Sequence, residues 1–177
     1  MNRLRLLVDN WKLPFLVSKF SFFMGTLVGI INGFVLSDYD INPIDLEFDE
    51  VFRNNLLVSL SIIVFGLFTF GLSSIVMMLA NGYVVGIVIG EALQLRMGVL
   101  LLTGLAPHFF TETLSLFLCS TVGFATGLQL FRWLRGIQLI RFKRLLFEIV
   151  MITTVSVLLL LVSAFIESNI SYVRIKE

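Results

Sequence analysis

The sequence predicts an all-α protein: a polytopic transmembrane helix bundle of about five spans, with a broken or re-entrant segment before the fourth. Hydrophobic residues make up 58% of the 177 residues and the mean hydropathy is +0.98, which is more apolar surface than one soluble domain can bury. No Asp, Glu, Lys or Arg occurs from 54 to 90 or from 149 to 166, and each run reaches the roughly 18 to 20 residues that cross a bilayer. Because these runs are continuous and rich in Leu, Ile, Val and Phe, we expect helices rather than alternating strands to cross.

The order of the charges predicts how the bundle is oriented. Basic residues precede the first apolar run, acidic residues follow it, and a second basic group comes before the last run. The positive-inside bias therefore places the N-terminus and the basic 131–144 loop in the cytoplasm and the acidic 37–53 loop outside, and five spans leave the C-terminus outside. The charged residues concerned are Arg3, Arg5, Lys12 and Lys19; Asp38, Asp40, Asp45, Glu47, Asp49 and Glu50; and Arg132, Arg135, Arg141, Lys143 and Arg144.

The first element expected is an interfacial helix over residues 1–19. Leu4, Leu7 and Trp11 recur at helical spacing among basic residues, as in a helix that lies at the membrane surface, and a frayed tail is the alternative. The first span should follow from about 20 to 36. We expect it to stay uncleaved, because no convincing small-residue cleavage site follows it.

The remaining spans follow from the later apolar runs. We expect them from about Asn54 to Ala80, from Gly82 to about Leu95, from about His108 to Leu130 and from about Leu145 to Ile166, with Asn81 and Gly82 ending the first of these. Pro107 lacks an amide hydrogen and suits the first turn of a helix, so a break at Ala106 is expected. The 97–107 segment should then re-enter the membrane and line an internal cavity, and one long tilted span is the alternative.

Small residues predict which helical faces meet. Ser21, Gly25, Gly29 and Gly33 repeat every fourth position in the first span, as do Gly82, Gly86 and Gly90 in the third, and Asn55, Ser59, Gly66 and Ser73 form a stripe in the second. In lipid, helix association depends on close backbone approach and on hydrogen bonds, so these stripes predict a compact bundle.

The candidate site is a set of polar residues inside the apolar segments. His108, Glu112, Ser115 and Cys119 are spaced by four, three and four residues, so they share one helical face, and His108 is the chain's only histidine. A carboxylate at bilayer depth is costly unless it is protonated, paired or hydrated, and His108 is an available partner for Glu112. Glu167, near the end of the last span, should lie at similar depth. We assign Asn55 and Asn81 to the same polar intramembrane cluster; a hydrogen-bonded histidine at a helix start is the plainer alternative for His108.

Four short motifs occur in a fixed order along the chain: Asn54 and Asn55, Asn81 with Gly82, Pro107-His108-x-x-x-Glu112, and Ala164-Phe165-Ile166-Glu167. With these motifs the chain resembles the stage II sporulation protein M family of bacterial and archaeal membrane proteins. It departs from the usual family pattern at Phe109, where glycine is common, and at 113–115, where Leu-Pro-Ala is frequent.

The resemblance implies a noncatalytic multi-pass component of a larger complex. One branch of the family is a membrane scaffold that holds cell-wall hydrolases during sporulation. Another resembles the small membrane proteins encoded beside circular bacteriocins, which are implicated with an ABC-type ATPase in maturation, export or immunity. The sequence has no Walker motif, so ATP-driven work would need a separate ATPase.

An intramembrane enzyme is the alternative of a different class. His108, Glu112 and Glu167 could ligate zinc with an open position, as in a metal-dependent peptidase. All three groups would then be ligands, which leaves no obvious general base, and Cys119 is three turns from His108, too far for direct activation. We therefore expect no metal and no cofactor.

The basic loop has two interpretations. As a solvated cytoplasmic loop it only sets orientation. As a docking strip for an ATPase or for anionic lipid headgroups, it combines the aromatics Trp133 and Phe142 with five positive charges, a mixture typical of the interface. The docking candidates are Arg132, Arg135, Arg141, Lys143 and Arg144. The expected partners are membrane lipids and other proteins, with a homo-oligomer also open, and no nucleic acid is expected.

Overall fold

The computed structural model describes residues 3–35, 48–101, 105–137 and 142–169, and its long elements are all helices. The helices are α1 (Arg3–Val35), α2 (Phe48–Phe68), α3 (Leu72–Gln94), α4 (Gly98–Leu100), α5 (Ala106–Leu134) and α6 (Phe142–Asn169). All except the three-residue α4 are long and apolar enough to cross a membrane, which gives five spans. The described residues contain no strand, so the predicted all-α bundle is confirmed.

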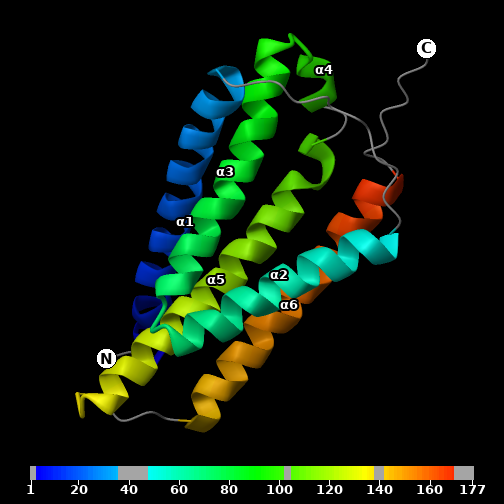
Figure 1. Ribbon diagram of the computed structural model, residues 1–177. Helices are drawn as coiled ribbons and strands as arrows, with labels where there is room; N and C mark the ends of the chain where they lie inside the picture. Colours follow the sequence, from blue (N-terminus) through cyan, green and yellow to red (C-terminus); the bar gives the residue numbers. More distant parts are fainter. Residues whose placement is uncertain (1–2, 36–47, 102–104, 138–141, 170–177) are drawn as a thin grey trace.

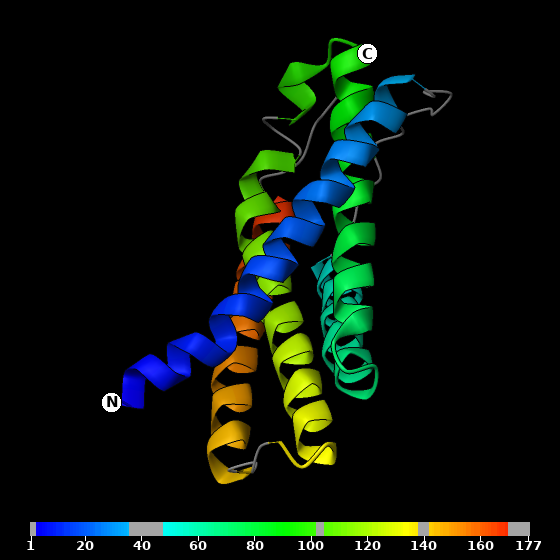
Figure 2. The same cartoon turned by 90° about the vertical axis from the view of Figure 1, so that its left-hand side faces the viewer.

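α5 is the central helix of the bundle. In its most apolar stretch of 18 residues, 61% of the residues are buried inside the bundle. In the corresponding stretches of the other four spans, the buried share is 22% to 33%. α1 and α3 lie side by side on one flank of α5, and α2 crosses α6 on the other flank (Figures 1 and 2). The outer faces carry large exposed apolar side chains such as Phe20, Phe65 and Phe165, as expected where helices meet lipid.

The predicted boundary between the second and third spans is wrong. We expected the second span to run to Ala80 and to end at Asn81 and Gly82, but these residues lie inside α3. The chain instead turns at Phe70 and Gly71, which have φ angles of 55° and 95°. Such left-handed backbone is easily adopted by glycine, and the turn divides one uncharged run into the hairpin of α2 and α3.

Six glycines bring α1 and α3 into backbone contact. A Cβ added at any of them would overlap a backbone carbonyl of the facing helix, so only glycine allows this approach. Ser21, the other member of the predicted α1 stripe, is also buried. The two predicted stripes therefore face each other. The glycines are Gly25, Gly29 and Gly33 of α1 and Gly82, Gly86 and Gly90 of α3.

α1 is one continuous helix that bends near its start. The first turns point away from the axis of the rest of α1 (Figure 2), and Pro14, which lacks an amide hydrogen, lies within this helix. The part from Trp11 to Val35 is long and apolar enough to span a membrane, so the helix extends before the predicted start at Phe20, and where the membrane begins along it stays a prediction. An interfacial position for the turns before Trp11 stays a prediction.

The two predicted cytoplasmic segments lie at the same end of the bundle. Trp11 of α1 donates from Nε1 to Oε2 of Glu148 at 3.0 Å, and Arg144 donates from Nε to Oε1 of the same carboxylate at 2.8 Å. The start of α2 lies far from this end (Figure 1). Which end faces the cytoplasm stays a prediction. Residues 36–47 of the expected acidic loop are outside the described residues, and its last residues form the first turns of α2.

The chain turns at Arg96, between α3 and α5 and before the predicted break at Ala106. Arg96 has a φ angle of 57° just after α3, the short α4 follows, and α5 begins at Ala106 with Pro107 in its first turn. Since residues 102–104 are outside the described residues, re-entry of the whole 97–107 segment stays a prediction.

Candidate functional site

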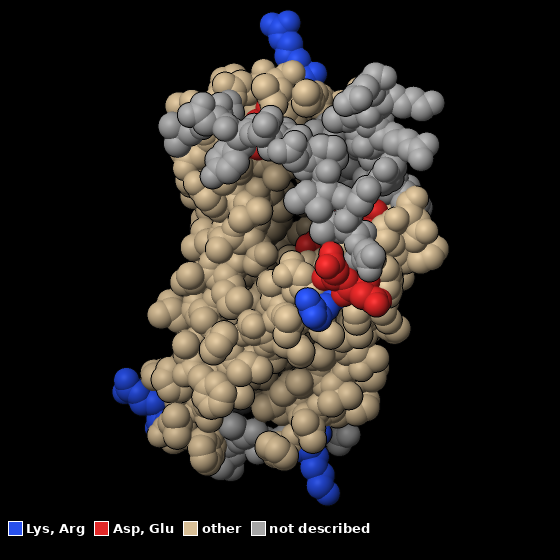
Figure 3. Space-filling model, turned by 45° about the vertical axis from the view of Figure 1, so that its right-hand side comes forward, with Lys and Arg blue, Asp and Glu red and all other residues tan. Residues whose placement is uncertain are grey.

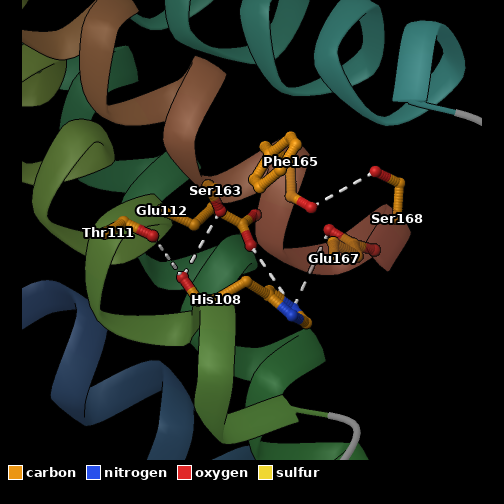
Figure 4. Close-up of polar contacts among 7 residues, drawn as sticks. All are labelled: His108, Thr111, Glu112, Ser163, Phe165, Glu167 and Ser168. Atoms are coloured by element: carbon orange, nitrogen blue, oxygen red, sulfur yellow. Dashed lines mark hydrogen bonds and ion pairs between the residues drawn. The ribbon is translucent and has the colours of Figure 1, made fainter. Parts of the chain in front are cut away.

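Three polar side chains from α5 and α6 converge near one end of these helices. His108 Nε2 lies 3.9 Å from Glu112 Oε2 and 3.8 Å from Glu167 Oε2 (Figure 4). One potential ligand atom from each residue lies within 4.8 Å of the other two. We call these three residues the His–Glu–Glu cluster. The sequence placed them at similar depth, and the structure brings them together.

The cluster follows from matching polar faces on two antiparallel neighbours. On α5, His108 lies in the first turn and Glu112 one turn later; on α6, Ser156, Ser163 and Glu167 repeat at helical spacing toward its end. Because α5 and α6 run in opposite directions, the start of one meets the end of the other. Glu167 therefore reaches His108.

Hydroxyl groups hold the main chain of His108 in place. Thr111 Oγ1 donates to the His108 carbonyl oxygen at 2.8 Å, and Ser163 Oγ donates to the same oxygen at 3.3 Å (Figure 4). Ser163 and Ala164 of α6 are fully buried, and their small size lets α6 come close to α5. The contact between α5 and α6 thus fixes the position of the His108 backbone, from which the imidazole ring extends.

The cluster is partly enclosed and unbalanced in charge. The His108 side chain is 10% exposed, while those of Glu112 and Glu167 are 28% and 21% exposed. Among the described residues, the one ion pair between a basic side chain of Lys or Arg and a carboxylate is Arg144 with Glu148, at the opposite end of α6. Two ionised carboxylates would carry two negative charges, and one imidazolium would offset only one.

That the other predicted residues belong to the same polar cluster stays a prediction. Ser115 is buried and donates from Oγ to the Ser156 carbonyl oxygen at 3.0 Å, which adds a second polar contact between α5 and α6. Asn81 donates to a carbonyl of its own helix at 2.8 Å. Asn55 is half-buried on α2, and no ion pair or hydrogen bond among the described residues joins it to the His–Glu–Glu cluster. Ser73, expected on the α2 stripe, belongs to α3.

A second polar group, deeper in the bundle, was only partly visible from the sequence. The buried Cys119 thiol lies among the hydroxyls of Ser59, Ser115 and Ser156, which come from α2, α5 and α6. Ser156 was not among the predicted site residues. The signal for it was its spacing of seven and eleven residues from Ser163 and Glu167, which places all three on one face of α6.

The predicted docking residues gather at the other end of α5 and α6, which we call the basic end. Figure 3 shows Lys and Arg side chains projecting at the lower end of the molecule. Arg135 lies over the Phe131 ring, 5.2 Å from its centroid, and Trp133 and Phe142 are 50% and 70% exposed. Arg141 is outside the described residues, and the described members are Arg132, Arg135, Lys143 and Arg144.

Comparison with known proteins agrees with the motifs. The family described as stage II sporulation protein M matches residues 15–172, which include the whole His–Glu–Glu cluster. An uncharacterized protein of Methanocaldococcus jannaschii is 28% identical over 174 residues, which cover 90% of this chain and 94% of the relative. No solved structure matches the chain. Because the family match extends over most of its length, this multi-pass membrane protein belongs to the stage II sporulation protein M family.

Proposed function

We propose that the protein is a noncatalytic membrane component of a larger complex, and that it docks a separate ABC-type ATPase through its basic end. The observation that supports this proposal is that three helices meet at the basic end. It joins the end of α5 to the start of α6, and the hydrogen bonds from Trp11 and Arg144 to Glu148 tie α1 to the same place.

The basic end suits a protein partner. Its described charged and aromatic side chains project from the ends of two helices, so docking would cost little backbone entropy there. Arginine beside exposed aromatic rings is a composition enriched at protein interfaces. Because α5 runs from this end to the His–Glu–Glu cluster through the middle of the bundle, a partner that tilts α5 would move both ends together.

Co-purification tests the proposal. The tagged full chain would be isolated from membranes of its own host, and the bound proteins identified. Reversing two charges at the basic end, with Arg132→Glu and Arg135→Glu, should lower the recovered ATPase at least tenfold, or about 1.4 kcal/mol. The matched control reverses Arg53 and Arg96, which are exposed and lie away from the basic end, and should keep the ATPase.

Two results would contradict ATPase docking. One is equal loss of the ATPase from the control variant, which would mean nonspecific charge attraction. The other is recovery of cell-wall hydrolases and no ATPase, which would favour the scaffold branch of the family. In either case the basic end would only set orientation in the membrane.

A second candidate function, an intramembrane metal-dependent peptidase, is favoured by the convergence of His108, Glu112 and Glu167. A metal there could polarise a peptide carbonyl and activate water. The test is cleavage of hydrophobic reporter peptides by the purified, zinc-loaded protein, compared with a Glu112→Gln variant. Cleavage by the unaltered chain, abolished in the variant, would replace the noncatalytic proposal.

A further inference from the structure

We infer that the His–Glu–Glu cluster is a binding site for one divalent transition-metal ion, with zinc first and manganese next. The inference begins from distance. The separations of 3.9 Å and 3.8 Å between His108 Nε2 and the two carboxylate oxygens exceed the 2.7 to 3.2 Å, roughly, of a hydrogen bond. The imidazole nitrogen and the two carboxylates therefore face one another across a space.

That space has the size of an ion. Since the ligand atoms lie within 4.8 Å of one another, a single point exists within about 2.8 Å of all three, the limit being reached by an equilateral triangle with that edge. Zinc binds histidine nitrogen and carboxylate oxygen at about 2.0 to 2.2 Å. Each ligand atom would have to move inward by at most roughly 0.6 to 0.8 Å, a distance within reach of small side-chain rotations.

The charge of the His–Glu–Glu cluster also favours a divalent metal ion. A divalent cation with two carboxylates and a neutral imidazole is an uncharged unit, which is the least costly form in a membrane interior. Without a metal, neutrality needs two protons distributed over His108, Glu112 and Glu167. A metal ion and a pair of protons are thus the two ways to neutralise the charge of this cluster. Only the metal-bound form would respond to a chelator or to added zinc.

The type of ligand also narrows the choice of metal. Mixed imidazole and carboxylate donors suit zinc and manganese, whereas magnesium and calcium prefer oxygen alone. Three protein ligands leave a further position for water or a partner's group, and the partly exposed side chains of Glu112 and Glu167 place that position on the open side of the cluster. The hydrogen bonds to the His108 carbonyl support the imidazole from behind.

Binding would clamp two helices together. His108 and Glu112 come from the start of α5 and Glu167 from the last turns of α6, so one ion would join these helix ends. This inference does not rest on ATPase docking, because the basic end lies at the opposite ends of the same helices. Failure of either proposal leaves the other standing.

Metal analysis of the full-length protein tests the inference. The chain would be purified in detergent, treated with a chelator, and titrated with zinc chloride or manganese chloride alone. Binding of about one zinc ion per chain is expected, with a rise in the thermal midpoint, and X-ray absorption should show nitrogen and oxygen ligands only. Glu112→Gln and Glu167→Gln keep the side-chain shape and should weaken zinc binding about 100-fold or more.

Matched controls separate the site from adventitious binding. Glu148→Gln removes a carboxylate from the other end of α6, and Cys119→Ser removes the only thiol; both should bind zinc as the unaltered chain does. Folding of each variant is checked by circular dichroism and gel filtration. The inference is overturned if the folded, unaltered chain binds no zinc above background, if the Gln variants bind it equally well, or if a sulfur ligand is found.

Discussion

Replacing glycine by alanine at the α1–α3 contact should weaken the bundle, although alanine is the better helix former. A Cβ at Gly29 would overlap the carbonyl of Tyr83, and a Cβ at Gly86 would overlap the carbonyl of Thr26. The obstacles are backbone atoms, so the two helices must separate to make room. Overpacking of this kind costs about 1 to 3 kcal/mol per site.

Helix propensity acts in the opposite direction. Alanine favours a helix interior over glycine by about 0.5 to 1 kcal/mol. Taking about 2 kcal/mol for the overlap, the net loss is about 1 kcal/mol for either single variant. Gly29 and Gly86 also face each other, since a Cβ on either one approaches the other's Cα, so the double variant should depart from additivity.

Reversible unfolding in mixed detergent micelles measures these free energies of unfolding. The matched control is Gly98→Ala, because Gly98 has no atom within 4 Å of an added Cβ and lies outside the α1–α3 contact. We expect this control to stay within about 0.5 kcal/mol of the unaltered chain. If Gly29→Ala or Gly86→Ala is as stable as Gly98→Ala, close backbone packing does not hold α1 to α3 and the argument fails.

Three further predictions concern charge and topology. His108→Ala and Glu112→Ala should each destabilise the protein, and the double variant should differ from their sum by about 1 to 3 kcal/mol; strict additivity in detergent melting would mean that they do not interact. In a cysteine-free background, cysteines at Asp45 and Lys143 should react with an impermeant reagent from opposite sides of the membrane, and labelling from one side would refute the topology. Trp11→Phe removes a half-buried hydrogen bond to a carboxylate and should cost about 1 kcal/mol, whereas an unchanged melting midpoint would show that this bond is dispensable.

The sequence predicted those features that depend on local pattern. Uncharged runs gave the number of spans, and Pro107 gave the start of α5, because a residue without an amide hydrogen is tolerated in a first helical turn. The pairing of His108 with Glu112 followed from their spacing on one helix. Glu167 joined them through an argument about depth, which needed the correct number of crossings as well as the local pattern.

The turn between α2 and α3 could not be located in the same way. Its polar backbone groups are satisfied within the turn: the amide of Gly71 donates to the carbonyl of Gly66 at 2.7 Å, and the amide of Ser73 donates to Thr69 Oγ1 at 2.9 Å. A turn that supplies its own hydrogen bonds needs no charged residue to mark it. Asn81 and Gly82 were the more conspicuous pair, but Gly82 serves helix packing instead.

The pairing of helices was beyond the sequence for a related reason. Glycine stripes in α1 and α3 show that each helix meets a close neighbour, but spacing alone does not identify which one. The structure pairs the two stripes with each other and leaves α5 to contact α6 through hydroxyls and the His–Glu–Glu cluster. The α1–α3 contact and the α5–α6 contact are thus of different kinds. Glycine substitutions should act on the α1–α3 contact whether or not zinc is present, and chelation should loosen α5 from α6 while the α1–α3 contact stays intact.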